Sequence, residues 1–146
     1  HYITIETEGS EAVGTKADLI SLSPKLSNST PVPGTMMPYL DREVTEKDKK
    51  KHEKWRCNYE AMIKLIDLHS DYQVKPVISN EQDLNEVKEL QKILDVPNKK
   101  VYLMPEGLEP NQLNERRRWL MELCTKEGYN FTDRLHIIAY GDIRGV

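Results

Sequence analysis

The chain has 146 residues, a formal net charge of −3 and a pI of about 5.8. This length predicts one domain, residues 1–146, that can bury a core of its own. The lack of a global basic charge argues against non-specific nucleic-acid binding, and no apolar run is long enough to span a membrane. No signal peptide is visible, and Cys57 and Cys124 lack partners at metal spacing, which is typical of thiols in a reducing, cytoplasmic compartment.

Five short apolar runs predict β-strands near residues 2–6, 18–22, 72–78, 100–104 and 135–140. Helical patterns follow several of these runs, and strand, loop, helix is the repeating unit of a parallel sheet. We therefore expect an α/β protein with about five parallel strands in sequential order. Right-handed crossovers should place the helices on one outer face of the sheet. Lys75 and Pro76 interrupt the third run, which predicts an edge strand or a bulge.

The connections between the strands differ in length and composition. Residues 10–16 are too few for a helix of normal length and predict a turn or a short helix. Residues 26–39 are rich in Ser, Thr, Pro and Gly and predict a long loop, of the kind that often forms a lid or a binding loop. Residues 41–54 contain five lysines that could contact nucleic acid, but five interleaved acids favour a solvated helix start.

Helical periodicity marks three segments. The first continues from the charged segment into an apolar stripe that predicts a core-facing helix. The second covers residues 80–95, where Asn80 can cap the helix and Asp83 can complete a capping box. The third covers residues 110–126, and Gly128 is suited to end it. The stripe of the first helix consists of Trp55, Tyr59, Met62 and Ile66.

Polar residues and glycines follow the ends of the predicted strands. Because the carboxyl ends of parallel strands meet at one edge of a sheet, these residues should line one rim and form a ligand site. Carboxylates could hold a hydroxyl-rich or cationic ligand, and a hydroxyl beside an ammonium could hold a carboxylate or phosphate. The alternatives are a solvated strand end and an ordinary turn lysine. The expected rim residues are Glu6, Ser23, Lys25, Ser79, Met104 and Gly141.

Five motifs occur in order along the chain: Ile-Glu-Thr-Glu-Gly, Ile-Ser-Leu-Ser-Pro-Lys, Val-Lys-Pro-Val-Ile-Ser, Tyr-Leu-Met-Pro-Glu-Gly, and Arg-Leu-His-Ile with a closing Arg-Gly. Together they resemble the 7-carboxy-7-deazaguanine synthase family of radical S-adenosylmethionine (SAM) enzymes in queuosine and 7-deazapurine biosynthesis. The resemblance runs nearly from end to end and implies a partial (β/α) barrel. It implies a ring contraction of 6-carboxy-5,6,7,8-tetrahydropterin with loss of ammonia. It also implies SAM, a 4Fe–4S cluster and Mg²⁺ as cofactors.

The resemblance assigns cofactor-binding roles at two strand ends. Glu6, Thr7 and Gly9 match the family's Glu-Thr-x-Gly, a strand end that approaches SAM. Ser23 and Lys25 match Ser-Pro-Lys, which also faces SAM, and their hydroxyl and ammonium groups suit a ribose and a carboxylate. The expected small-molecule partner is the pterin substrate, a homodimer is the assembly to test, and no nucleic-acid or membrane partner is expected.

Further roles are implied toward the end of the chain. Met104 would pack on the adenine of SAM. His136, Arg144 and Val146 resemble the end of the family's chain, where they would face the substrate, since a pterin carboxylate favours a neighbouring arginine or protonated histidine. A lone histidine is otherwise usually structural. No catalytic residue and no Mg²⁺ ligand is visible in this sequence.

The family's Cys-x₃-Cys-x₂-Cys cluster motif and its Gly-Gly-Glu-Pro strand end are absent, and both lie upstream in the family. The chain also begins at His1, directly ahead of a predicted strand. We therefore expect the C-terminal part of a radical SAM partial TIM barrel. Because the cluster needs three thiolates, this chain alone should not cleave SAM. Its first strand should leave an open edge, to be paired with another chain or covered by residues 27–39.

An alternative interpretation is a stand-alone small α/β module, flavodoxin-like in fold, that binds or interacts without catalysis. Such a fold would place a full helix directly after its first strand. The short connection at residues 10–16 argues against this alternative.

Overall fold

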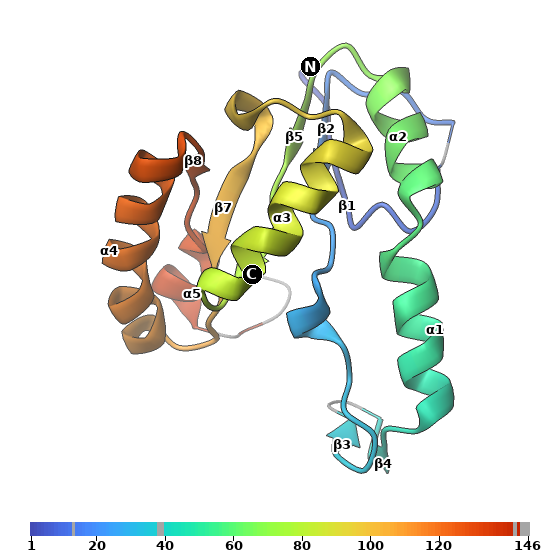
Figure 1. Cartoon of the computed structure of the whole chain (residues 1–146), viewed down its shortest axis with the longest axis vertical. Coiled ribbons are helices and arrows are strands. Elements are labelled where there is room, and N and C mark those ends of the chain that lie inside the picture. The colour runs from blue at the N-terminus through green and yellow to red at the C-terminus, as the bar shows by residue number, and fades with distance from the viewer. Residues whose placement is uncertain (13, 38–39, 142, 144–146) are drawn as a thin grey trace.

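The computed structural model describes residues 1–12, 14–37, 40–141 and 143, and it shows a mixed α/β fold (Figure 1). The helices are α1 (Glu46–Arg56), α2 (Tyr59–Leu68), α3 (Glu81–Leu94), α4 (Pro110–Glu127) and α5 (Leu135–Tyr140), with short 3-10 turns at Ser27–Ser29 and Asn98–Lys100. The strands are β1 (Thr4–Thr7), β2 (Leu19–Leu22), β3 (Met36–Met37), β4 (Arg42–Glu43), β5 (Tyr72–Val74), β6 (Val77–Ile78), β7 (Tyr102–Pro105) and β8 (Asn130–Phe131).

The main strands are parallel and follow one another in sequence order. One sheet has the order β1-β2-β5 and another the order β6-β7-β8, and every pair in them is parallel. A parallel bridge between Val74 and Val101 joins the two sheets. The predicted sequential, parallel order is therefore confirmed for the first four of the five predicted strands, although the described residues form no closed barrel.

Lys75 and Pro76 separate β5 from β6. The Lys75 N–H still donates to the Leu22 carbonyl, with an N–O distance of 2.6 Å. Pro76 has no N–H to donate, but its carbonyl accepts a hydrogen bond from the Met104 N–H at 3.1 Å. The interruption predicted from the sequence is thus present. It lies in the middle of the strand order, where proline is unusual, and the strand accommodates it by breaking into two short pieces.

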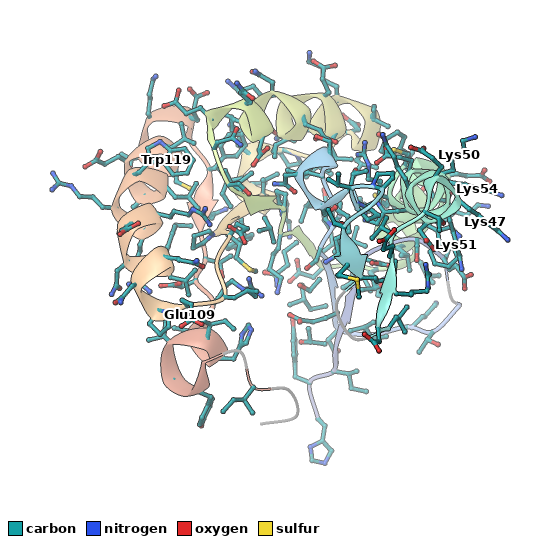
Figure 2. All side chains as sticks on the ribbon, turned by 90° about the horizontal axis from the view of Figure 1, so that it is seen from below. Lys47, Lys50, Lys51, Lys54, Glu109 and Trp119 are labelled. Carbon is teal, nitrogen blue, oxygen red and sulfur yellow. The ribbon has the colours of Figure 1, made fainter. Side chains whose placement is uncertain are left out.

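Helices α2, α3 and α4 pack on one face of the strands, as predicted, and lie along the outer side of the curved arrangement (Figure 2). The residues beneath them form a continuous apolar core whose members are almost fully buried. This one-sided arrangement differs from a doubly wound fold, which has helices on both faces of its sheet. The central core residues are Ile20, Leu22, Met62, Leu65, Val87, Leu103 and Leu120.

Two of the helix ends follow the sequence prediction closely. Asn80 and Asp83 form a complete capping box at the start of α3. Gly128, at a φ of 75°, ends α4 in the left-handed conformation that glycine adopts without strain. Local side-chain chemistry therefore sets both boundaries.

The helix predicted to carry the aromatic stripe is in fact two helices. Asn58 starts α2, and its side chain accepts a hydrogen bond from the Ala61 N–H at 3.4 Å, so the chain turns between α1 and α2. Met62 is fully buried, whereas Trp55 lies on α1 and is 49% exposed. Trp55 is therefore not a core residue, contrary to the prediction.

The fifth strand predicted at residues 135–140 is wrong. This segment is helix α5, which buries Ile137 and leaves Leu135 71% exposed. The last strand among the described residues is β8, which begins five residues before this segment and pairs with β7. A six-residue apolar run cannot distinguish a strand from a short helix, and here the run ends in the left-handed Gly141 at a φ of 72°.

Strand β1 lies at the end of the strand order, so its outer edge is unpaired among the described residues. The segment after β2 does not cover this edge, contrary to one of the predicted possibilities. It runs along α3 instead, where Ser27 contacts Glu86 and Asn28 contacts Asp83. The segment then forms the antiparallel β3–β4 hairpin.

Candidate functional site

The face of the sheet opposite the helices carries a row of polar side chains. Successive residues of a strand point to opposite faces, so Glu6, Ser21 and Gln73 share one face because their Cα positions pair across β1, β2 and β5. The Gln73 amide donates to the Ser21 hydroxyl at 3.0 Å. Ser21 is fully buried, and this hydrogen bond satisfies its hydroxyl. The sequence analysis did not identify this polar row.

Lys75 extends the polar row and binds Glu6. The Lys75 Nζ lies 2.6 Å from Glu6 Oε1, and the Lys75 side chain is only 13% exposed whereas that of Glu6 is 67% exposed. Glu6 was predicted as a cofactor ligand, and the structure gives its carboxylate a protein partner in the link between β5 and β6. Sequence reasoning treated Lys75 only as a strand interruption. A lysine within an apolar strand was the available signal, because a buried ammonium requires a partner.

The ends of β1 and β2 bring four predicted residues together. The Ser23 N–H donates to the Thr7 carbonyl at 2.7 Å, and the Gly9 N–H donates to the Thr7 hydroxyl at 3.1 Å. Gly9 is buried at a φ of 81°, and a Cβ there would lie 2.8 Å from Met62 Cγ. Gly9 is therefore required for packing against the core. Lys25 follows Ser23 at the same edge of the sheet.

A pocket of about 260 Å³ lies beside Lys25. The β1 side contributes Glu8 and Ser10, and the Ser10 hydroxyl donates to Glu8 Oε1 at 3.1 Å. Glu8 and Lys25 bring opposite charges to one small space, which can bind a ligand that carries both an ammonium and a carboxylate. The opposite wall comes from α1 and consists of His52, Trp55 and Arg56.

An ion-pair network holds α1 against this pocket. The Arg56 guanidinium lies between Glu53 at 2.6 Å and Glu86 at 2.7 Å, and its side chain is 12% exposed. Glu53 also accepts a hydrogen bond from the Thr30 hydroxyl. The Arg56 hydrogen bond, with the Thr30 hydrogen bond as a smaller cause, lowers the pKa of Glu53 to about 2. Glu86 in turn accepts from the Ser27 backbone and hydroxyl, so three segments meet at one cluster of charges.

The other predicted rim residues lie farther along the sheet. The Ser79 N–H donates to Asp83 Oδ2 at 2.7 Å, and Met104 pairs in register with Val77. Met104 is therefore separated from Lys25 by the strand that contains β5 and β6. Gly141 ends a helix and not a strand, so its expected place at a strand end is wrong.

The residues expected to face the substrate are only partly described. His136 lies on α5 and is exposed. The start of α5 lies near the end of β7, because the Arg134 guanidinium donates to the Gly107 carbonyl at 2.7 Å. Arg144 and Val146 lie outside the described residues.

The described residues contain no group of three or more His, Cys, Asp or Glu side chains that could hold a metal ion. Cys57 ends α1, and Cys124 is buried in α4 with its Sγ 3.4 Å from the Asn130 carbonyl. Burial raises the pKa of Cys124 to about 11, so it is held as a thiol. Iron–sulfur clusters require thiolates, so these two separated cysteines do not fit a 4Fe–4S cluster. No described helix is both long and apolar enough to cross a membrane.

Several proteins of known name are similar to this chain. It is 35% identical to 7-carboxy-7-deazaguanine synthase from Rhodopirellula baltica over 145 residues, which is 99% of this chain and 53% of that protein. It is 30% identical to the synthase from Halobacterium salinarum over 154 aligned positions, 97% of this chain and 55% of that protein. The synthase from Pyrobaculum aerophilum is 35% identical over 71 residues, 49% of this chain and 32% of that protein.

No family model matches the chain, and no solved structure matches it significantly. The chain spans about half the length of the two synthases that it matches from end to end. The resemblance inferred from the five motifs is nevertheless confirmed by four proteins that carry the same name. Over nearly its whole length, this chain is related to the 7-carboxy-7-deazaguanine synthases.

Proposed function

We propose that this chain forms the C-terminal part of a radical SAM 7-carboxy-7-deazaguanine synthase. The reaction would contract the ring of 6-carboxy-5,6,7,8-tetrahydropterin with loss of ammonia, in queuosine and 7-deazapurine biosynthesis. The observation that supports this most directly is the relation to synthases over 99% of the chain. The sequential parallel strands with one polar edge are compatible with part of a (β/α) barrel, in which ligands bind at the carboxyl ends of the strands.

In this proposal the ends of β1 and β2 bind SAM. Lys25 would bind its carboxylate, Ser23 its ribose, and Glu8 its ammonium group within the 260 Å³ pocket. The Lys75 ammonium would hold Glu6 in a fixed position through their 2.6 Å contact. SAM supplies the radical chemistry of this enzyme class, and the residues of this chain bind, orient and shield it.

The substrate would occupy the part of the rim beyond β7. Met104 would contact the adenine of SAM, and His136, Arg144 and Val146 would face the pterin. The cluster ligands would come from outside this chain, since its two cysteines do not fit a cluster. The Mg²⁺ ligands would also come from elsewhere, because the described residues contain no suitable group.

A chimaera with the R. baltica synthase tests the proposal. The matching 53% of that protein would be replaced by this chain, reconstituted anaerobically with iron and sulfide, and incubated with dithionite, SAM, Mg²⁺ and the pterin. We expect 5′-deoxyadenosine and 7-carboxy-7-deazaguanine by chromatography, and neither from this chain alone. A cluster-loaded chimaera that cleaves SAM without forming the product would contradict the proposed reaction.

Lys25→Gln in the chimaera tests the site. We expect at least tenfold weaker SAM binding, because a charge-assisted contact to the carboxylate is lost. Lys16→Gln is the matched control, since Lys16 is exposed and lies outside the pocket. Equal SAM affinity in both variants would exclude Lys25 from the cofactor site.

A further inference from the structure

Four lysines form a continuous stripe on the outward side of α1 (Figure 2). The lysine stripe consists of Lys47, Lys50, Lys51 and Lys54, at positions i, i+3, i+4 and i+7 of the helix. This spacing confines them to about 100° of the helix circumference and about 10 Å of its length. All four are exposed. Among the residues that the structure describes, no carboxylate forms an ion pair with any of them.

Two of the three acids on this helix are bound by arginines and not by the lysines of the stripe. Asp48 is bound by the Arg42 guanidinium at 2.8 and 2.9 Å and by the Thr45 hydroxyl at 2.7 Å. Glu53 is bound by Arg56, which lines the pocket beside Lys25. Glu46 is the third acid, at the start of the helix four residues before Lys50, and no ion pair joins the two among the described residues. The helix thus leaves the four lysines of the stripe without an ion-paired carboxylate.

The position of α1 exposes the stripe further. Helix α1 buries none of its residues, and it extends from α2 to the β3–β4 hairpin at the far end of the molecule (Figure 1). Lys51 lies over the Trp55 ring, 4.3 Å from its centroid, which restricts that side chain without neutralising its charge. The core does not require a charged helix in this position, so the stripe is available to a partner.

We propose that the lysine stripe docks a compact acidic surface of another protein. The chain carries a net charge of −3 that includes these four lysines, so the remainder carries −7. A long nucleic acid would extend past the 10 Å stripe and meet this acidic remainder, whereas an acidic patch of matching size would contact the stripe alone. The stripe also contains no arginine for two-point binding of phosphate and no amide side chain to recognise a base.

The test compares two variants with the same change in net charge. The first, K47Q/K50Q/K51Q/K54Q, removes the lysine stripe, and glutamine is compatible with a helix. The second, K16Q/K49Q/K99Q/K126Q, changes four exposed lysines outside the stripe. Circular dichroism and thermal unfolding verify that both variants retain the fold.

Binding is measured by fluorescence anisotropy at 20 and 150 mM NaCl with three labelled probes. One is an alanine-rich helical peptide with four glutamates at i, i+3, i+4 and i+7, and the second carries its four glutamates scattered around the helix. The third is a 20-nucleotide oligouridylate. We expect the striped peptide to bind at least fivefold more tightly than the scattered one. We also expect the striped peptide to bind more weakly at the higher salt concentration than at the lower one. The stripe variant should lose at least tenfold in affinity, and the control variant less than twofold.

Three results would overturn the proposal. Equal affinity for the two peptides would show that the arrangement of the lysines has no effect. Equal losses of affinity for the striped peptide in the two variants would show that net charge alone determines the binding. Tighter binding of the oligouridylate than of the striped peptide, lost in the stripe variant alone, would assign the stripe to nucleic acid instead.

Discussion

At the scale of single residues, glycines show how backbone strain and packing act separately. Gly9 has a φ of 81° and would place a Cβ 2.8 Å from Met62 Cγ, whereas Gly34 has a φ of 86° and open space around it. We expect Gly34→Ala to lower the free energy of unfolding by about 1 kcal/mol through strain alone. Gly9→Ala should cost about 2–4 kcal/mol, because overpacking adds to the strain. Urea unfolding measures the free energy of unfolding of both variants. Equal losses of stability would exclude the predicted collision between the added methyl group at position 9 and Met62. Gly14→Ala, with nothing within 4 Å, is the neutral control.

The buried thiol of Cys124 allows a second prediction at this scale. With a pKa of about 11, only about one molecule in a thousand carries the thiolate at pH 8. We expect Cys124 to react with iodoacetamide on the order of 100-fold more slowly than a free cysteine, because the thiolate is the nucleophile. Mass spectrometry of Cys57→Ser, which leaves Cys124 as the one cysteine, measures the rate. Fast labelling of the folded variant would show that the thiol is accessible.

At the scale of elements, the network beneath α1 makes the attachment of this helix depend on pH. The pKa of Glu53 is lowered from 4.5 to about 2, so its stabilising contribution is complete above pH 4.5 and is lost as the pH falls toward 2. Glu53→Gln should therefore increase hydrogen exchange in α1 at pH 7. The effect should be modest, since the Glu53 side chain is 35% exposed.

The difference between the wild type and Glu53→Gln should shrink as the pH falls from 5 to 2. Hydrogen exchange of residues 46–56, corrected for the intrinsic pH dependence of exchange, is the measurement. Glu60→Gln is a matched control on α2, where the exposed carboxylate pairs with Lys64 and not with Arg56. A constant difference across this range would contradict the assigned role of the Glu53 carboxylate.

The elements also show what the sequence could predict. Strands β1, β2 and β7 and helices α3 and α4 were predictable, because apolar runs and capping residues such as Asn80 are local signals. The break after α1 depends on Asn58, a cap hidden within a continuous helical pattern. The Lys75–Glu6 pair joins residues that are 69 positions apart, and no local pattern indicates such a contact. Lys25 was predictable as a strand-end residue, whereas the α1 wall of its pocket depends on the whole fold.

At the scale of the whole molecule, burial predicts an uneven distribution of stability. The strands and α2–α4 share one buried core, whereas residues 40–56 contain one buried residue, Val44. We expect amides of β2 and β7 to exchange only on global unfolding, and those of the β3–β4 hairpin to exchange through local opening. Hydrogen exchange followed by mass spectrometry over a denaturant series distinguishes global unfolding from local opening. Uniform protection across both regions would show that the hairpin belongs to the same cooperative unit.

The sequential order of the strands has a consequence for synthesis and engineering. Within each of the two parallel sheets the strands follow one another in chain order. A newly made strand can therefore pair with one that has already left the ribosome, without waiting for later segments. Cleavage of the connection between α2 and β5, near residues 69–71, would likewise leave two fragments that are each continuous in space. Reassembly would require the β2–β5 pairing and the helix contacts beside it. The connection is therefore a suitable split point for fragment complementation.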